Sequence, residues 1–289
     1  MFNKFMKELQ YRENILPDFL IIGGMKCGTT SLHYYLKFHP EIVMSTEKEL
    51  DFFIKEKNLE KGVDWYKSQF KGKAKIYGEA SPNYTNYPRW EGCPERIYNL
   101  KSDIKLIYIL RDPLVRILSQ YIHEYKEERE NLPFDEAIFN NDDYIFRSSY
   151  YLQLEQYLKY FPPYNIFITT IEELSNFPES TLKSILNFLN ISEDISMIPY
   201  QKILHNSIHK RRKNKLGNII SKNPLIKKID LLPPPYRYRL QHLIYFPFSH
   251  AIKRPQLTEN LREKLINLLQ EDVYKLREYT GKNFEQWCL

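Results

Sequence analysis

The chain has 289 residues, 43% of them hydrophobic and 15% aromatic, and its formal net charge is +6. This composition excludes a disordered chain and predicts a large folded domain. Because cationic and anionic residues are interspersed, the positive excess favours an anionic ligand without requiring nucleic acid, and we expect no nucleic-acid partner.

Strands and helices alternate along most of the sequence. In chain order the predicted elements are strand 19–22, helix 31–38, the extended segment 42–44, strand 75–79, strand 104–110, a helix that begins at Pro113, helix 150–161, strand 165–170, helix 180–189 and helix 261–279. The run 104–110 is almost wholly apolar, which is typical of a strand covered on both faces. We therefore predict an α/β fold of the P-loop type, with a central parallel sheet and helices on both faces.

Residues 203–254 interrupt this alternation. They contain the basic run 209–215, which suits phosphates or an anionic acceptor and equally a solvated loop. We predict an irregular, lid-like insert near the C-terminus. The whole chain, 1–289, is then a single domain, with a nucleotide-binding core at 17–202 and a C-terminal helix within 255–289.

The segment 19–32 carries the most informative motif. A buried strand leads into a Gly-rich turn in which Gly23 and Gly28 keep the G-x-x-x-x-G spacing of a Walker A loop. Thr29 stands where that loop has Lys, and the only Lys in the turn, Lys26, comes earlier. We therefore predict a cradle of backbone N–H groups that binds a phosphate but not the tail of Mg·ATP.

Ligands of open parallel sheets bind at the carboxyl ends of the strands, where we expect the segments 23–30, 78–82 and 111–119. Arg111 directly follows a strand, so its guanidinium can grip a phosphate with two hydrogen bonds. Ser119 lies about two helical turns further along on the same face, which predicts a second phosphate position. The alternative for Arg111 is a salt bridge to Asp112 or to another neighbouring carboxylate.

Five segments carry a family resemblance: 24–32 (GMKCGTTSL), 39–40 (HP), 48–53 (KELDFF), 79–82 (EASP) and 109–121 (ILRDPLVRILSQY). Together they resemble the sulfotransferases that use 3′-phosphoadenosine-5′-phosphosulfate (PAPS), in particular the branch with the heparan sulfate N- and 3-O-sulfotransferases. The resemblance implies an in-line transfer of a sulfuryl group from PAPS to a hydroxyl or amine. The acceptor is then a carbohydrate or another small molecule, and the product is PAP.

The resemblance also assigns residues to roles. The loop that binds the 5′-phosphosulfate consists of Lys26, Cys27, Gly28, Thr29, Thr30 and Ser31. The Lys26 ammonium meets the leaving oxygen, where negative charge develops, and Arg111 with Ser119 holds the 3′-phosphate. Glu49 acts as general base on the acceptor, a role that contributes ~10²–10⁴ in rate. PAPS is the only cofactor implied, and we expect no metal.

Three departures from the family pattern concern the acceptor and the insert. The 3-O branch has a Lys where this chain has Ala80, and the C-terminal cysteine pair of that branch has no match. Its nucleotide-contacting loop matches loosely, which assigns Arg211 and Arg212 to the nucleotide. Three aromatic residues of the insert either stack on a sugar or adenine ring or form a small core: Tyr236, Tyr238 and Phe246.

Further candidates on the acceptor side are Asp51, Ser81, Tyr84 and His123. Glu47, Asp51 and His123 compete with Glu49 for the role of base. Ser81 is equally part of an ordinary turn, and His123 is equally a packing or capping residue.

The three cysteines form neither a disulfide framework nor a C-x-x-C pair. We interpret Cys27 as a space-filling residue, because a thiolate nucleophile needs a paired base. The N-terminus has no signal-peptide core, and no apolar run has the length of a membrane span. We therefore expect a cytoplasmic protein without stable membrane insertion, and the oligomeric state stays open.

Two other function classes stay open as well. A small-molecule P-loop kinase would need Mg²⁺ and a Walker-type Lys. A catalytically silent nucleotide- or polyanion-binding protein would use the basic insert as its binding surface. The presence of both Lys26 and Glu49 favours the sulfotransferase.

Overall fold

A computed structural model describes residues 15–201, 211–221, 223–227, 229, 240 and 243–289. The chain packs as two compact units. The described residues of the first unit lie within 1–117, 142–205 and 259–289, and those of the second lie within 118–141 and 206–258. The single domain expected from the sequence stays a prediction.

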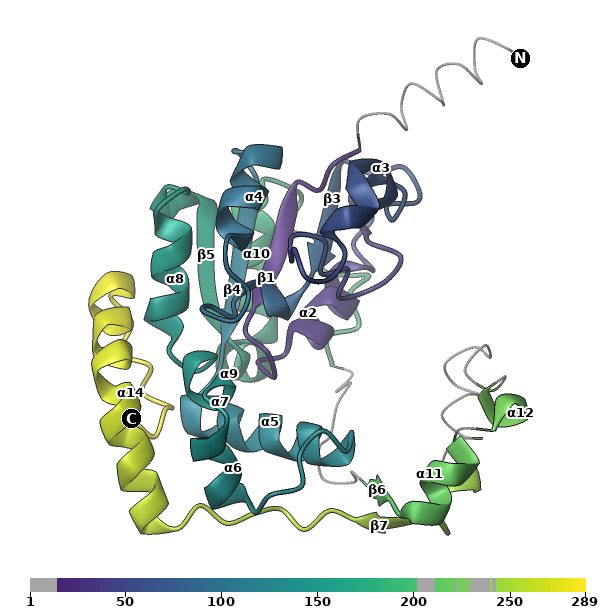
Figure 1. Cartoon of the computed structure of the whole chain (residues 1–289). Helices are drawn as coiled ribbons and strands as arrows, with labels where there is room; N and C mark the ends of the chain where they lie inside the picture. Colours follow the sequence, from purple (N-terminus) through teal and green to yellow (C-terminus); the bar gives the residue numbers. More distant parts are fainter. Residues whose placement is uncertain (1–14, 202–210, 222, 228, 230–239, 241–242) are drawn as a thin grey trace. The chain divides into compact units, whose positions relative to one another are not determined.

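The first unit is built on a five-stranded parallel sheet with the order β2-β3-β1-β4-β5 (Figure 1). The strands are β1 (Phe19–Gly23), β2 (Ile42–Met44), β3 (Ile76–Ala80), β4 (Lys105–Leu110) and β5 (Ile166–Thr170). In the central strand β1, Leu20 is opposite Glu79 of β3 and Leu106 of β4. Every residue of β1 is buried, as expected for a strand that is covered on both faces.

Helices cover both faces of this sheet, which confirms the predicted α/β fold. Leu20 and Ile22 point to one face and Phe19 and Ile21 to the other, as the two-residue period of a strand requires. The first face packs against α4 (Cys93–Leu100), α8 (Tyr150–Leu158) and α14 (Glu259–Thr280). The second face packs against α2 (Thr29–Leu36), α9 (Ile171–Asn176) and α10 (Pro178–Phe188).

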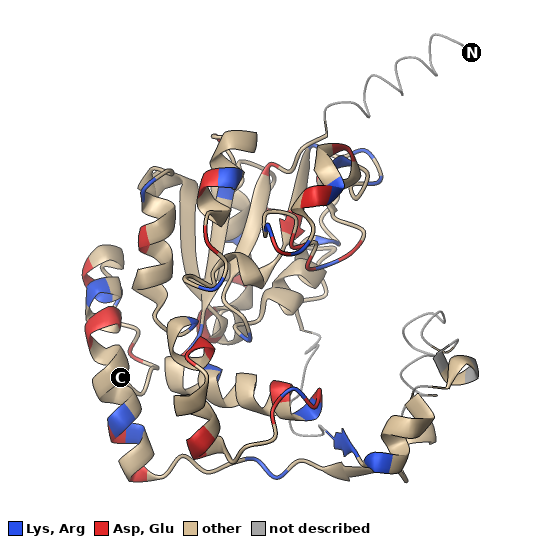
Figure 2. Ribbon diagram, viewed as in Figure 1, with Lys and Arg blue, Asp and Glu red and all other residues tan. Residues whose placement is uncertain are grey.

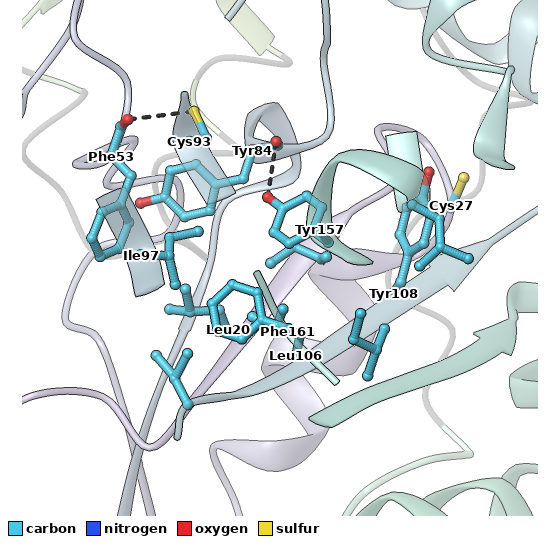
Figure 3. Packing of buried hydrophobic residues seen from close by; sticks show 14 of the residues in the cluster. Leu20, Cys27, Phe53, Tyr84, Cys93, Ile97, Leu106, Tyr108, Tyr157 and Phe161 are labelled. Atoms are coloured by element: carbon cyan, nitrogen blue, oxygen red, sulfur yellow. Dashed lines mark hydrogen bonds between the residues drawn. The ribbon is translucent and has the colours of Figure 1, made fainter. Parts of the chain in front are cut away.

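The core on the first face also anchors the loops that follow β2 and β3. The Tyr157 hydroxyl on α8 donates a hydrogen bond to the carbonyl oxygen of Tyr84 at 3.0 Å (Figure 3). The Cys93 thiol on α4 donates to the carbonyl oxygen of Phe53 at 3.3 Å. Two segments that carry candidate site residues are therefore tied to packed helices.

Several short elements join these helices and strands. In the first unit they are η1 (Leu59–Lys61), α3 (Gly62–Lys67), η2 (Pro82–Tyr84), α7 (Asp143–Phe146) and η3 (Pro163–Asn165). The helix α5 (Pro113–Lys126) begins in the first unit and ends in the second, which also contains α6 (Phe134–Asn140). None of the short helices was predicted from the sequence, because one or two turns show too little periodicity.

The predicted irregular insert needs a correction in its described part. There β6 (Arg211–Lys213) pairs in antiparallel fashion with β7 (Ser249–Ala251), and two short helices occur, α11 (Lys215–Ser221) and α12 (Pro224–Lys227). This part of the insert therefore has regular structure of its own. Its role as a lid stays a prediction, and Tyr236 and Tyr238 lie outside the described residues.

Candidate functional site

The strand order places three predicted site segments at one edge of the sheet. After β1 the chain builds β2 and β3 on one side of it and then crosses to β4 on the other side. A ligand crevice forms where neighbouring connections leave a parallel sheet in opposite directions. The segments that follow the carboxyl ends of β1, β3 and β4 lie at this point.

The Gly-rich loop (residues 23–28) is fixed to the sheet by its backbone. The Gly24 N–H donates to the carbonyl oxygen of Ile109 on β4. A Cβ on Gly23 would lie 2.0 Å from the Thr85 hydroxyl oxygen, which itself donates to the Ile22 carbonyl at 3.0 Å. Only glycine therefore permits this close approach of the loop to the segment after β3.

The end of the loop has the left-handed backbone that starts α2. Gly28 has φ +92°, and a Cβ there would lie 2.6 Å from Cδ1 of Ile171. In the described part of the chain no side chain caps α2, and its first turn carries no acidic residue. The N–H groups of that first turn therefore suit an anion, so the observed donor set fits a phosphate group. Of the predicted ligands in this turn, Thr29 is buried and Thr30 and Ser31 are half-buried.

The structure brings the turns after β1 and β4 into contact. Nη1 of Arg111 donates to the carbonyl oxygen of Lys26 at 3.2 Å, and Lys26 has a left-handed φ of 67°. The Tyr150 hydroxyl donates to the Arg111 carbonyl at 2.7 Å and lies 3.6 Å from Sγ of Cys27. Burial raises the pKa of the Cys27 thiol to about 11, so at neutral pH this residue is an uncharged part of the core.

Asp112, one of the ion-pair partners considered for Arg111, binds backbone N–H groups. Its Oδ1 accepts the N–H groups of Leu114 and Val115 at 2.8 and 3.1 Å, which caps the start of α5. Its Oδ2 accepts the N–H of Cys288 at 2.6 Å. Among the described residues, no salt bridge joins Arg111 to Asp112.

The Glu49 loop (residues 45–58) follows β2 and is held by the segment after β3. The N–H of Glu49 donates to the Ala80 carbonyl at 2.9 Å, whereas those of Asp51 and Phe52 donate to side-chain hydroxyls. Glu49 and Asp51 both have left-handed backbones, with φ of 63° and 48°. The Glu49 side chain is half exposed and forms an ion pair with Lys48. Non-glycine residues with a left-handed backbone need contacts with their surroundings to stabilise that conformation, and such residues cluster at functional sites.

Asp51, in the same loop, has a buried side chain that belongs to a polar network. Asp51 is 6% exposed, and its carboxylate accepts the Asn83 amide at 2.9 and 3.2 Å and forms an ion pair with Lys57. Nη1 of Arg147 donates to the Asn83 amide oxygen and also lies 3.2 Å from Sδ of Met25 in the Gly-rich loop. Arg147 was not predicted from the sequence, because no local pattern distinguishes it from a surface Arg.

The hydroxyls of Ser81 and Tyr84 point into the core and not to the surface, with exposed fractions of 0% and 2%. Both donate to the carboxyl group of Glu79, which is completely buried and also accepts the Tyr66 hydroxyl. Burial raises the pKa of Glu79 to about 7, although the three hydroxyls oppose this shift. Whether Ser81 and Tyr84 touch an acceptor stays a prediction. The sequence offered only one signal for Glu79, its place in the EASP segment.

Four predicted site residues belong to the second unit, and their roles stay predictions. Ser119 and His123 lie on α5, where Nε2 of His123 is 3.3 Å from a guanidinium nitrogen of Arg129. Nε of Arg211 donates to the Ser249 hydroxyl at 2.9 Å, and its guanidinium stacks 4.2 Å from the centre of the Phe246 ring. Arg212 stacks 4.0 Å from the centre of the Tyr125 ring and donates to the Glu130 carbonyl. Both guanidiniums therefore have partners inside the second unit.

The described residues contain no group of three or more His, Cys, Asp or Glu side chains that could hold a metal ion. None of the helices in this part of the chain is both long and apolar enough to cross a bilayer. Figure 2 shows Lys and Arg interspersed with Asp and Glu along the described elements.

Comparisons with known proteins identify relatives of this chain. The sulfotransferase domain family matches residues 16–229. The mouse heparan sulfate glucosamine 3-O-sulfotransferase 5 is 35% identical over 195 residues, which cover 63% of this chain and 55% of that protein. The human bifunctional heparan sulfate N-deacetylase/N-sulfotransferase 3 is 25% identical over 294 residues, which cover 91% of this chain and 32% of that protein. The matched region thus spans about half the length of the first relative and less of the second.

Solved structures show the same fold. A sulfotransferase from Alicyclobacillus acidocaldarius has a TM-score of 0.68 at 24% identity, over 95% of this chain and 99% of that one. Mouse sulfotransferase SULT7A1, solved in complex with PAP, has a TM-score of 0.51 at 14% identity, over 92% and 88% of the two chains. The relatives include the heparan sulfate branch that the motifs resemble. This chain belongs to the sulfotransferase family.

Proposed function

We propose that this sulfotransferase transfers a sulfuryl group from PAPS to a hydroxyl or amine of a glycan or another small acceptor. The observation that carries the proposal is the contact of Arg111 with Lys26, which joins the turns after β1 and β4 at the carboxyl edge of the sheet. The Glu49 loop is bound to β3, the strand next to β1. The residues suited to a nucleotide follow β1 and β4, and the residue suited to an acceptor lies in a loop bound to β3, the neighbour of β1.

On the donor side, PAPS supplies a sulfuryl group bonded to an oxygen of its 5′-phosphate. The N–H groups at the start of α2 and the Lys26 ammonium would bind the phosphate and stabilise the charge that develops on the bridging oxygen. Arg111 would bind the 3′-phosphate with its planar guanidinium. The assignment of Ser119 to that phosphate, and of Arg211 and Arg212 to the nucleotide, rests on the sequence alone.

On the acceptor side, Glu49 would remove the proton of the attacking group. A bond forms between the acceptor oxygen or nitrogen and sulfur, while the bond from sulfur to the 5′-phosphate oxygen breaks. The proton goes to the Glu49 carboxylate, and the electron pair of the broken bond goes to the phosphate. The exposed position and left-handed backbone of Glu49 support this role.

A glycan acceptor is proposed because the two curated relatives carry heparan sulfate in their names. One is a 3-O-sulfotransferase and the other an N-sulfotransferase, so the proposal includes hydroxyl and amine acceptors. Cytoplasmic location and the absence of a nucleic-acid partner stay predictions from the sequence.

Radiolabelled PAPS tests the proposal directly. The protein is incubated with the label and a panel of heparan sulfate oligosaccharides and small hydroxylated compounds, and products are screened for the mass gain of one SO₃. We expect transfer from PAPS, no phosphorylation with Mg·ATP, and loss of transfer in Lys26→Ala and Arg111→Ala while both variants stay folded. Full activity in either variant would contradict the assignment of the donor site.

A further inference from the structure

The buried carboxyl group of Glu79 lies beneath the Glu49 loop and does not contact it directly in any described hydrogen bond. We infer that Glu79 is a positioning residue, which orients the Ser81 and Tyr84 hydroxyls so that they hold the backbone of the Glu49 loop. The inference deepens the proposed function, and it rests on that proposal where it concerns turnover. The part that does not depend on turnover concerns two hydrogen bonds of this loop, those donated by the N–H groups of Asp51 and Phe52.

Each of the two hydroxyls has one donor and one acceptor partner. The Ser81 hydroxyl donates to Oε1 of Glu79 and accepts the N–H of Asp51 at 3.0 Å. The Tyr84 hydroxyl donates to the same oxygen at 2.8 Å and accepts the N–H of Phe52 at 3.0 Å. A hydroxyl has only one proton to donate. When it donates that proton in a hydrogen bond to the carboxyl oxygen, the lone pairs of its own oxygen face the amide N–H and accept from it.

Protonation chemistry supports the direction of these bonds. Burial raises the pKa of the Tyr84 hydroxyl well above 10, so it keeps its proton and must donate it to an acceptor. Glu79 is the acceptor within reach. If Oε1 were absent, neither hydroxyl would have its carboxyl acceptor, and both would be free to turn away from the loop.

The two oxygens of Glu79 have different partners. Oε1 accepts from Ser81 and Tyr84, which hold the loop, whereas Oε2 accepts from Tyr66 on α3. In the described hydrogen bonds, the Tyr66 hydroxyl holds no amide of the Glu49 loop. A glutamine at position 79 can keep the oxygen toward Ser81 and Tyr84 and direct its NH₂ group to the Tyr66 oxygen, so it would preserve the support of the loop.

The held amides are close to the proposed base. Asp51 has a φ of 48°, a left-handed conformation that an Asp residue keeps only when its surroundings stabilise it. It lies two residues after Glu49, whose own N–H is fixed by the Ala80 carbonyl. Release of the Asp51 and Phe52 amides would therefore let the Glu49 carboxylate move relative to an acceptor, and sub-ångström placement matters for proton transfer.

A set of matched variants tests the inference: Ser81→Ala, Tyr84→Phe, Glu79→Met, Glu79→Gln and Tyr66→Phe. Turnover is measured with radiolabelled PAPS and heparan sulfate, and the Kd of PAP is measured by calorimetry. We expect Ser81→Ala and Tyr84→Phe each to lower kcat about tenfold and Glu79→Met to lower it further. Glu79→Gln and Tyr66→Phe should stay within about threefold of the wild type, and the Kd of PAP should stay within about twofold in every variant.

A second measurement does not depend on activity. Amide hydrogen exchange, resolved at Asp51 and Phe52, should be about tenfold faster in Ser81→Ala, Tyr84→Phe and Glu79→Met and unchanged in Glu79→Gln and Tyr66→Phe. Unchanged exchange in Ser81→Ala and Tyr84→Phe would overturn the inference, even if Glu79→Met fails to fold. A parallel loss of PAP binding, or an equal effect of Tyr66→Phe, would also overturn it.

Failure of the proposed function is recognised separately. If Glu49→Gln keeps full turnover, Glu49 is not the base, whereas the exchange rates at Asp51 and Phe52 still decide whether Glu79 positions the loop. If the exchange rates stay unchanged while Glu49→Gln is inactive, the positioning role is wrong and the base assignment stands.

Discussion

The Gly-rich loop and the Glu49 loop are both bound to the central sheet, but by different parts of the chain. The first is held by its backbone, through the bond from Gly24 to Ile109 and the close approach of Gly23 to Thr85. The second is held by backbone bonds at Ser45, Thr46 and Glu49 and, at Asp51 and Phe52, by side chains, the Ser81 and Tyr84 hydroxyls. A loop held by its backbone depends on where glycine occurs, whereas a loop held by side chains depends on a buried polar network.

This difference has a consequence for stability. The Gly-rich loop is supported by the hydrogen bonds and packing that also form the sheet. The Glu49 loop needs a completely buried carboxyl group, whose ionised form is disfavoured in the core. Substitutions that add a Cβ to a glycine should therefore destabilise the first loop. Substitutions that remove a hydrogen bond, and changes of pH, should destabilise the second.

The largest effect is expected from Glu49→Gln, which removes the base but keeps the shape of the side chain. We expect kcat to fall by ~10²–10⁴ and the Kd of PAP to stay unchanged, because the base acts on the acceptor. Glu47→Gln is the matched control, since Glu47 is exposed, lies two residues away and competes for the same role. A larger loss in Glu47→Gln than in Glu49→Gln would show that the base was assigned to the wrong residue.

Lys26→Ala should come next, because it removes the cation of the Gly-rich loop and leaves the N–H groups of α2. Removal of one preorganised group that stabilises developing charge costs ~10²–10³ in kcat. Turnover and the Kd of PAP are measured together, and both should be affected, unlike in Glu49→Gln. A variant that binds PAP and turns over like the wild type would remove Lys26 from the site.

The Glu79 carboxyl group predicts a pH dependence of stability. Its pKa in the folded protein, about 7, lies above the ordinary 4.5, so between these values the folded state holds a proton that the unfolded state has lost. The free energy of unfolding should therefore fall as pH rises from 4.5 to 7, by roughly 3 kcal/mol in total, and then level off. Urea unfolding of the wild type and of Glu79→Gln at pH 5 and pH 8 measures this.

The difference between the two proteins isolates Glu79, because other titrating groups are common to both. Asp272, whose pKa burial raises to about 6, acts in the same direction and cancels in the comparison. An equal change with pH in the wild type and in Glu79→Gln would show that Glu79 titrates normally.

The smallest effect concerns the backbone of the Gly-rich loop. Gly28→Ala and Gly281→Ala both place an alanine at a positive φ, +92° and +65°, which costs about 1–2 kcal/mol. A Cβ at Gly281 meets nothing within 4 Å, whereas one at Gly28 meets Ile171 at 2.6 Å. Gly28→Ala should therefore lower the free energy of unfolding by about 1–3 kcal/mol more than Gly281→Ala in urea titrations. Equal losses in the free energy of unfolding would mean that the loop shifts to accommodate the added methyl group.

The sequence predicted the parts of the molecule that depend on local pattern. The apolar run of β4, the Gly-rich turn and the proline that starts α5 each determine structure within a few residues, so the parallel sheet and the two turns followed from them. The position of Arg111 after its strand was likewise readable.

The supporting residues could not be read in this way. Glu79, Tyr66 and Arg147 act through partners that lie 2 to 122 positions away in the chain, and their side chains meet only after the sheet forms. The regular structure in the insert was also not predicted, because β6 and β7 have three residues each and lie far apart in the sequence. Short strands of this kind acquire their pattern from the partner strand.

Diffraction from crystals soaked with PAP tests the central claim most directly. The account predicts the 5′-phosphate within hydrogen-bond distance of the N–H groups at residues 28–31 and of the Lys26 ammonium, and the 3′-phosphate on the Arg111 guanidinium. Density for PAP elsewhere on the protein, or a 3′-phosphate that does not contact Arg111, would contradict it.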